Sequence, residues 1–122
     1  MNANSSNIKV VKFGGSSLAD ASQFRKVAEI IKADPERLFV VPSAPGKRFS
    51  DDTKVTDMLY ECYNVAASGK NIDDLFNNLR ERYDSIIREL GLDYDLTEEY
   101  DHIKRSIRHH AGRDYLPAAV NI

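Results

Sequence analysis

Apolar residues follow two different patterns along the chain, and the pattern changes near its middle. In the first half, Ile8–Phe13 and Leu38–Val41 are short runs rich in β-branched residues, which are typical of buried strands. Between them lie apolar residues at helical spacing: Phe24, Val27, Ala28 and Ile31. Asp20 or Ser22 can cap this helix, and Asp34-Pro35 ends it. Strand, helix and strand at this spacing predict a βαβ unit with parallel strands and a right-handed crossover.

The second half shows helical periodicity alone. A first helix, ending near Ser68-Gly69, is indicated by Val55, Met58, Leu59, Cys62, Val65 and Ala66. A longer one, with Asp73 and Asp74 in its first turn and Gly91 after its end, is indicated by Ile72, Leu75, Phe76, Leu79, Tyr83, Ile86, Ile87 and Leu90. A third, started by Thr97-Glu98-Glu99, is indicated by Leu96, Tyr100, Ile103, Ile107 and Ala111.

Two parallel strands are too few for a finished α/β sheet, whose strands are normally paired on both sides and covered on both faces. The pattern therefore predicts an α/β fold that is begun and left incomplete, followed by a helical second half. An unpaired parallel strand leaves an exposed edge, so we also expect marginal stability and self-association.

Composition places the chain among soluble globular proteins. Its 122 residues are 42% hydrophobic and 30% charged, so disorder is not expected. A net charge of −2 argues against a nucleic-acid footprint or a polybasic membrane patch. The polar start, "MNANSSN" at residues 1–7, is neither a signal peptide nor an anchor, and we expect it to be disordered. Cys62 is the single cysteine, which fits a reducing cytoplasm.

The stretch "KVVKFGGSSLAD", residues 9–20, raises the question of a phosphate site. Lys12 lies near the carboxyl end of the first strand, where ligands of open α/β sheets bind. Gly14 and Gly15 would let a phosphate approach the backbone amides, and Lys12 would supply positive charge. Two alternatives stay open on the residues alone. The glycines can form a tight turn, and the lysine can extend to solvent from a strand end.

Neither glycine motif matches a familiar nucleotide signature. "GGSS" is not GxGxxG, and "GKR" at residues 46–48 lacks the earlier glycine and the following Ser or Thr of a Walker motif.

Three motifs, occurring in order, resemble aspartate kinases of the amino-acid kinase family. "VVKFGGSSLADASQFRKVAEII" resembles the opening of those enzymes, and "FVVPSAPGKR" with "KVTDMLY" resembles their second substrate loop. Other kinases of the superfamily share a Lys-x-Gly-Gly start, but the Phe, the "SS" and the "FRKVA" helix favour aspartate kinase. The similarity spans residues 8–116. It implies the N-terminal part of an αβα sandwich of the amino-acid kinase (carbamate kinase-like, Rossmann-like) type.

The resemblance implies phosphoryl transfer from ATP to the side-chain carboxylate of L-aspartate, giving 4-phospho-L-aspartate, the first step towards lysine, threonine and methionine. It implies that Lys12 is catalytic and contacts the ATP phosphates. It places Phe13, Gly14, Gly15 and Ser16 at the phosphate, and Ser43, Ala44, Gly46 and Thr56 at the aspartate. It also implies Mg²⁺ with the ATP, although no metal site is visible in the chain. A homo-oligomer is expected from the exposed strand edge.

Other chemically active residues have simpler interpretations. His109 and His110 are adjacent on a helix and cannot form an i,i+4 metal pair, so we expect surface histidines. Cys62 falls on an apolar stripe and is expected in a core. Asp51–Thr53 is expected to be solvated loop and helix start rather than a metal site.

The last six residues depart from the family, which continues from a segment like "GRDYL" into "ASRGEYLN". If the parent codons are CTG GCC AGC CGC GGT GAA TAT CTG AAC, loss of one G from GCC gives CTG CCA GCC GCG GTG AAT ATC TGA. This reads Leu-Pro-Ala-Ala-Val-Asn-Ile-stop, which is the sequence from Leu116 to Ile122. Our hypothesis is a frameshifted tail at residues 117–122; a truncated or separately evolved short protein is the alternative.

Two functions therefore stand. The chain is an aspartate kinase by descent, represented by its N-terminal portion. Alternatively, it is a catalytically inactive fragment or a non-catalytic assembly partner.

Overall fold

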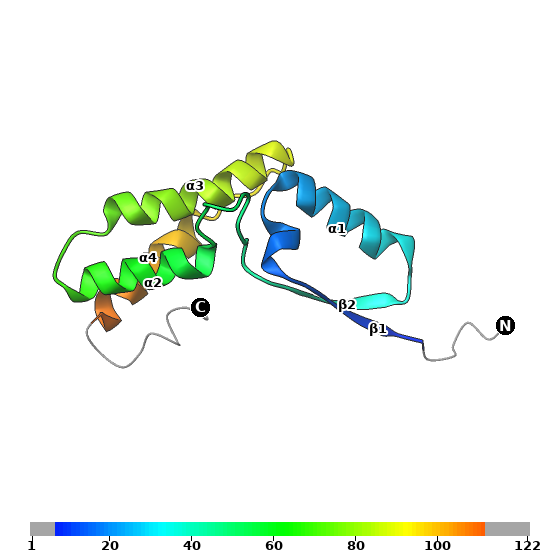
Figure 1. Ribbon diagram of the computed structural model, residues 1–122, viewed down its shortest axis with the longest axis horizontal. Coiled ribbons are helices and arrows are strands. Elements are labelled where there is room, and N and C mark those ends of the chain that lie inside the picture. Colours follow the sequence, from blue (N-terminus) through cyan, green and yellow to red (C-terminus); the bar gives the residue numbers. More distant parts are fainter. Residues whose placement is uncertain (1–6, 112–122) are drawn as a thin grey trace. The chain divides into compact units, whose positions relative to one another are not determined.

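The computed structural model describes residues 7–111, which form two compact units (Figure 1). The first extends to Asp52 and the second begins at Thr53. All but the last residue of the predicted tail at 1–7 lies outside the described residues. The same holds for residues 112–116 of the predicted kinase segment and for the predicted frameshifted tail at 117–122.

The first unit is the predicted βαβ arrangement. Strand β1 (Lys9–Phe13) pairs in parallel with β2 (Arg37–Pro42), and helix α1 (Ala21–Ala33) connects them. A short 3₁₀ helix, η1 (Gly15–Leu18), lies between β1 and α1. The register pairs Lys12 with Val41 and Phe13 with Pro42. The two strands therefore end side by side.

Both ends of α1 follow from local chemistry. Asp20 is the N-cap residue, because its Oδ1 accepts a hydrogen bond from the backbone N–H of Gln23 at 3.0 Å; Ser22 lies inside the helix. At the other end Asp34 is extended, with φ −139° and ψ 110°, as the residue before a proline tends to be. The Lys9 Nζ, 2.6 Å from Asp34 Oδ2, lowers the pKa of that carboxyl.

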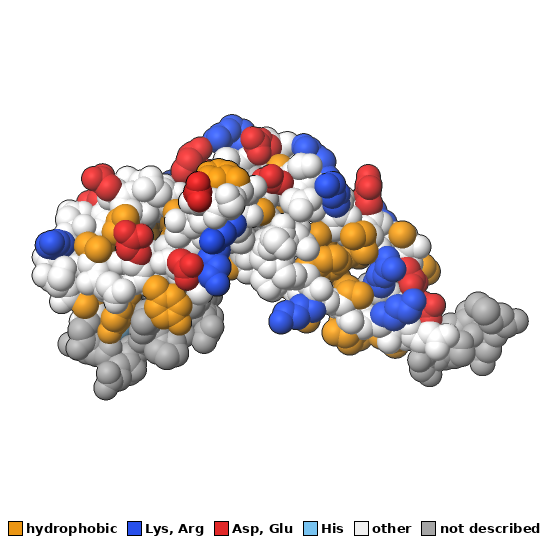
Figure 2. Space-filling model, viewed as in Figure 1, with side chains coloured by type: hydrophobic (Ala, Val, Ile, Leu, Met, Phe, Trp, Pro, Cys, Tyr) orange, Lys and Arg blue, Asp and Glu red, His pale blue; other side chains and the backbone are white. Residues whose placement is uncertain are grey.

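The prediction that the two strands are buried is wrong for this chain. Val10 has 69% of its surface exposed, Phe39 58% and Val41 46% (Figure 2 shows hydrophobic side chains at the surface of this unit). By the register, Val10 and Val41 lie on the same face of the sheet as Lys12, opposite to the half-buried Val11 and Phe13. Strands of a parallel sheet are buried when helices cover both faces of the sheet. In this unit the single α-helix, α1, accompanies the two strands, so they remain exposed.

The second unit consists of the three predicted helices: α2 (Val55–Ala67), α3 (Asp73–Glu89) and α4 (Thr97–His110). The first two end as the sequence predicts. Gly69 and Gly91 follow them with φ of 81° and 68°, a left-handed conformation that favours glycine. In the described part of the chain, no helix combines the length and apolar character needed to cross a bilayer.

The core of the second unit is built from all three helices. Its buried members are Val55, Cys62, Ile72, Phe76, Leu79, Ile86, Tyr100 and Ile107. Phe76 of α3 and Tyr100 of α4 meet edge to face with ring centroids 6.5 Å apart. Burial of these side chains is the main stabilising contribution to this unit.

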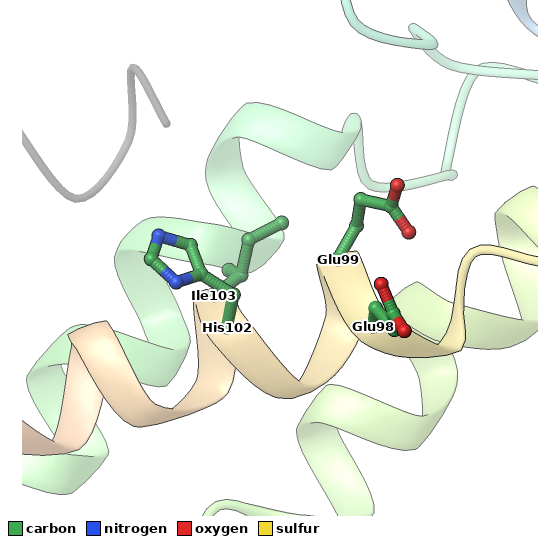
Figure 3. Close-up of a pocket in the computed structure, with 4 residues that line it drawn as sticks. All are labelled: Glu98, Glu99, His102 and Ile103. Carbon is green, nitrogen blue, oxygen red and sulfur yellow. The ribbon is translucent and has the colours of Figure 1, made fainter.

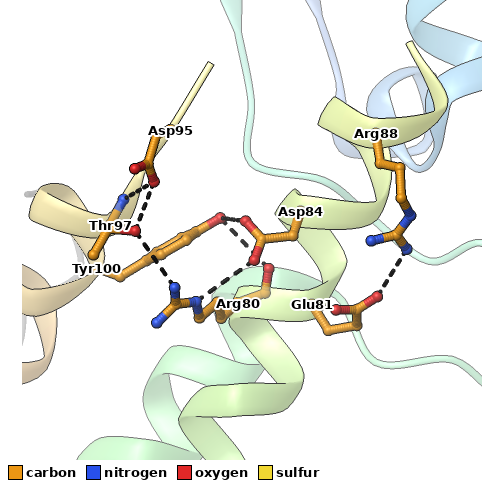
Figure 4. Close-up of polar contacts among 7 residues, drawn as sticks. All are labelled: Arg80, Glu81, Asp84, Arg88, Asp95, Thr97 and Tyr100. Carbon is orange, nitrogen blue, oxygen red and sulfur yellow. Dashed lines mark hydrogen bonds and ion pairs between the residues drawn. The ribbon is translucent and has the colours of Figure 1, made fainter. Parts of the chain in front are cut away.

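A polar network joins α3 to α4 beside this core (Figure 4). The Tyr100 hydroxyl donates to Asp84 Oδ1 at 2.8 Å, and Arg80 Nε lies 3.5 Å from Asp84 Oδ2. The Arg80 guanidinium also lies over the Tyr100 ring, 5.2 Å from its centroid. Burial, followed by the bond to Asp84, raises the pKa of Tyr100.

Candidate functional site

Two loops leave the sheet from the same edge. The first loop, residues 14–20, follows Phe13, and the second loop, residues 43–52, follows Pro42. Phe13 and Pro42 are register partners at the carboxyl ends of parallel strands. This edge is where open α/β sheets gather their ligands. The structure therefore places both predicted loop motifs at the same edge of the sheet.

The two loops are in direct backbone contact. The Ser43 N–H donates to the Phe13 carbonyl at 3.1 Å, and the Gly46 N–H donates to the Gly15 carbonyl at 2.8 Å. A Cβ added to Gly46 would lie 2.6 Å from the Gly15 carbonyl carbon, closer than real Cβ atoms come. A Cβ on Gly15 would lie 3.1 Å from the Ala44 carbonyl oxygen. Gly46 therefore needs glycine because the backbones approach so closely, whereas a Cβ at Gly15 would require the facing backbone to shift by a few tenths of an ångström.

Gly14 has a different environment. A Cβ there would meet no heavy atom within 4 Å, and the residue is exposed and extended, with φ −74°. A ligand can therefore reach the backbone at Gly14. The missing Cβ of Gly15 is used by the second loop, which is a reason for glycine that the sequence alone did not reveal.

Lys12 lies two residues before Gly14, on β1, and is exposed. Its register partner Val41 is also exposed, so the ammonium group can extend into solvent next to the loops. Ser16, in η1, is exposed as well. Its carbonyl accepts a bond from the Gln23 side chain at 3.3 Å, which links the first loop to α1.

The second loop is closed by an ion pair that the sequence reasoning missed. Asp52 accepts three hydrogen bonds from Arg48: from its backbone N–H at 3.0 Å, from Nε at 2.7 Å and from a terminal guanidinium nitrogen at 2.9 Å. These bonds raise the pKa of Arg48, with a further contribution from the charge of Asp20. The stretch 51–53, which was predicted to be solvated, thus contains the Asp52 carboxylate, which is ion-paired and mostly buried. The two charges are four residues apart, but that spacing indicates an ion pair only on a helix, so the loop sequence contained no signal for it.

Eight of the nine predicted site residues belong to the first unit. They are Lys12, Phe13, Gly14, Gly15, Ser16, Ser43, Ala44 and Gly46. Thr56 belongs to the second unit, where it is half-buried in the first turn of α2.

In the described part of the chain, the other chemically active residues do not come together as a reactive group. The Cys62 side chain is buried, with 0% exposed, and burial raises its thiol pKa to about 11, so it is a core residue as predicted. His109 is exposed and His110 half-buried, and their rings meet edge to face at 4.8 Å. Among residues 7–111, no three His, Cys, Asp or Glu side chains are placed to hold a metal ion together.

Two of the hollows in the described part of the second unit differ in the character of their lining. One, of about 230 Å³, is lined by Glu98, Glu99, His102 and Ile103, all from α4, and Figure 3 shows His102 pointing away from the two carboxylates. The other, of about 180 Å³, is mostly apolar and includes Leu59, Leu96 and Ile103. Neither gathers convergent polar groups of the kind found in small-molecule sites.

Comparison with known proteins gives a consistent result. A family model described as "Amino acid kinase family" matches residues 7–107. Aspartokinase 3 of Bacillus subtilis (strain 168) is 46% identical over 92 residues, which are 75% of this chain and 20% of that protein. The aspartokinase of Chlamydia trachomatis serovar D is 37% identical over 87 residues, which are 71% of this chain and 18% of that protein.

Comparison with solved structures agrees with these sequence matches. The crystal structure of Clostridium acetobutylicum aspartate kinase superimposes with a TM-score of 0.81 at 40% identity, over 93% of this chain and 28% of that one. The predicted fold class, an incomplete α/β fold of the amino-acid kinase type, is thereby confirmed. The chain spans about a fifth of the length of the curated relatives it matches.

Proposed function

The chain belongs to the amino acid kinase family, and from this premise we propose that it is the N-terminal portion of an aspartate kinase. The proposed reaction transfers the terminal phosphoryl group of ATP to the side-chain carboxylate of L-aspartate and gives 4-phospho-L-aspartate. The enzyme would act in the cytoplasm, as a homo-oligomer, at the first step of lysine, threonine and methionine biosynthesis. The resemblance to aspartokinases supports these statements.

The observation that carries the proposal is the contact between two loops at one sheet edge. Phosphoryl transfer between two anions depends mostly on positioning and on neutralising charge. Lys12 would provide the positive charge, and the exposed backbone at Gly14 would accept the phosphate closely. Because the second loop is bonded to the first through Gly46 and Gly15, an acceptor held there would lie near the phosphate.

The second loop would bind the aspartate. Ser43 and Ala44 are half-buried at the beginning of that loop, where a hydroxyl and backbone groups can contact a small polar ligand. Thr56 is assigned to the same substrate by the family motif. Mg²⁺ would enter as the ion bound to ATP, a role that rests on the family resemblance.

A chimera tests the proposal. The corresponding N-terminal segment of Bacillus subtilis aspartokinase 3 is replaced by residues 7–111 of this chain, and ATP-dependent aspartyl hydroxamate formation is measured. We expect an active chimera whose kcat falls at least about a hundredfold with Lys12→Ala, since one electrostatic contact to a transferring group contributes about this much. Lys26→Ala, which removes an exposed lysine on α1, is the matched control and should change little.

The 122-residue chain by itself is expected to form no product, because it matches 28% of the solved relative. This inactive-fragment alternative is further supported by the exposed apolar strands of the first unit. A folded chimera that is inactive, or one in which Lys12→Ala and Lys26→Ala behave alike, would contradict the proposal. Hydroxamate formation by the chain alone, above its Lys12→Ala variant, would contradict the inactive-fragment alternative.

The frameshift hypothesis for residues 117–122 has its own test. The encoding DNA should continue after the stop codon in a frame displaced by one base, and that frame should encode further kinase sequence. An unrelated downstream sequence would overturn it.

A further inference from the structure

The hydrogen bonds between the two loops continue the parallel ladder past the end of the strands. The acceptors are the carbonyls of Phe13, the last residue of β1, and of Gly15, the first residue of η1; they are two residues apart, as acceptors are along a regular strand edge. The donors on the other side are the amides of Ser43 and Gly46, three residues apart. The second loop therefore contains one additional residue between its two bonds.

Pro45 explains the additional residue. A proline has no backbone N–H, so a regular ladder that placed the donor at this position could not form its bond. The chain instead passes over Pro45, which is buried, and donates from Gly46. This bulged path brings the Gly46 backbone against the Gly15 backbone.

The backbones of Gly46 and Gly15 are so close that residue 46 has no space for a side chain. A Cβ on Gly46 would be 2.6 Å from the Gly15 carbonyl carbon, 2.8 Å from its oxygen and 2.8 Å from the Ser16 nitrogen. All three atoms are backbone atoms of the first loop, so no side-chain rotation can relieve the overlap. A methyl group at residue 46 must push the two loops apart.

Each loop is also fixed by side-chain hydrogen bonds away from the contact, so the contact joins two restrained segments. The Gln23 side chain binds the Ser16 carbonyl, and the Arg48–Asp52 pair closes the second loop just after Gly46. These bonds restrict how far either loop can move away from the contact at Gly46.

We propose that Gly46 is a positioning residue that sets the shape of the first loop through its contact with Gly15, so that ligand binding at one loop is coupled to the other. This inference rests on the proposed phosphate role of the first loop. Gly46 itself need not touch either ligand. The coupling would ensure that the phosphate loop and the acceptor loop are aligned together.

The contact is tested first without any ligand. In the ¹⁵N-labelled 122-residue chain, amide hydrogen exchange should be slowed at Gly46 and at Ser43 by at least about tenfold relative to an open amide. In Gly46→Ala, residue 46 should lose this protection while Ser43 keeps it, because the Ser43 bond precedes the bulge. Helix amides of α2 to α4 report that the second unit remains folded.

The coupling is tested with ATP, and with adenosine as the probe that lacks phosphates. In the unmodified chain, ATP should shift the amide signals of Gly14–Ser16 and of Ser43–Gly46 with one common midpoint, and adenosine should shift neither group. In Gly46→Ala we expect the first-loop midpoint to rise at least about tenfold, since misplacement by about 1 Å can cost that or more. The second-loop signals should no longer respond.

Two further variants calibrate the result. Ser50→Ala changes an exposed residue of the same loop and should leave exchange and midpoints unchanged. Gly15→Ala is milder than Gly46→Ala, because its contacts are 3.1–3.2 Å, and it serves if Gly46→Ala does not fold. The expected order of effect is Gly46→Ala, Gly15→Ala, Ser50→Ala.

Each alternative outcome has a defined meaning. An unprotected Gly46 amide in the unmodified chain overturns the contact. A protected amide with equal ATP midpoints in Gly46→Ala and the unmodified chain overturns the positioning role. A protected amide with no ATP response in any variant overturns the coupling together with the proposed phosphate site, while the contact between the loops stands.

Discussion

Arg82 shows how a charged residue can take a place in an apolar core. It lies three residues after Leu79 and four before Ile86, on the buried stripe of α3, with 4% of its surface exposed. Its guanidinium donates to the Thr53 carbonyl at 2.8 Å and so ties α3 to the residues just before α2. The sequence pattern had assigned the neighbouring Tyr83 to this stripe, and Tyr83 is half-buried. A charge at an apolar position, with a backbone acceptor in reach, was the overlooked signal.

Removing this side chain should destabilise the helical unit. We expect Arg82→Ala to lower its free energy of unfolding by about 2 kcal/mol, because a bond from a charged donor and the packing of a long side chain are both lost. The measurement is urea unfolding followed by helical circular dichroism. Arg105→Ala, at an exposed site on α4, is the matched control. Equal midpoints for the two variants would show that the Thr53 bond contributes nothing.

Cys62 gives the helical unit a dependence on alkaline pH. Burial, with the charge of Glu61, raises the thiol pKa to about 11 in the folded chain, above the value of about 8.5 for an unfolded thiol. The thiol's contribution is therefore complete below about pH 8.5 and is lost as the pH rises towards 11. We expect the unfolding free energy to fall across this window, by at most about 1.4 kcal/mol per pH unit from this group.

The same pH series on Cys62→Ala separates this contribution from the others. The raised pKa values of Tyr83 and Tyr100 act in the same direction, so the variant should keep a shallower slope and not a flat line. An unchanged slope would rule out the thiol as a source of the pH dependence.

At the scale of elements, the capping of α1 can be tested with a close pair of variants. Asp20→Ala should destabilise α1 by about 1 kcal/mol, because the Gln23 amide loses its side-chain acceptor. Ser22→Ala, two residues further along the chain, removes the other candidate cap and should have little effect. Amide exchange within residues 23–30 of each variant measures the difference. Faster exchange in Ser22→Ala than in Asp20→Ala would reverse the assignment of the cap.

The helices and strands were largely predictable because their signals are local. The apolar period of α3, the acidic first turn and the glycine after its end all lie within one segment. The contact between Gly15 and Gly46 joins residues far apart in sequence, and glycines carry no side-chain pattern that could announce it. The exposure of Val10 and Phe39 was not predictable either, since burial depends on which surfaces cover a strand and not on the strand's own sequence.

At the scale of the whole chain, the exposed strands should determine whether the protein self-associates in solution. One face of the sheet presents Val10, Phe39 and Val41, and the strand edges add unpaired backbone groups. We expect the chain to self-associate at micromolar concentration. Phe39→Lys combined with Val41→Lys should shift the weight-average mass in sedimentation equilibrium towards the monomer, because like charges would meet at the contact.

A control variant shows whether this effect is specific to the sheet. Leu92 is an exposed residue between α3 and α4, and Leu92→Lys makes a similar exchange of apolar area for charge away from the strands. It should leave the mass distribution unchanged. A monomeric unmodified chain, or an equal shift in Leu92→Lys, would contradict self-association through the sheet.

The placement of Cys62 also gives the chain an internal probe of how fast its helical unit opens. The only cysteine of the sequence lies in the core of the second unit, so a thiol reagent reacts when that unit opens and is blind to openings confined to the first. Labelling rates at rising reagent concentration would level off at the opening rate of the helical unit. A substitution in the loops can thus be compared with one in the helices by a single mass-spectrometric time course, without an engineered label.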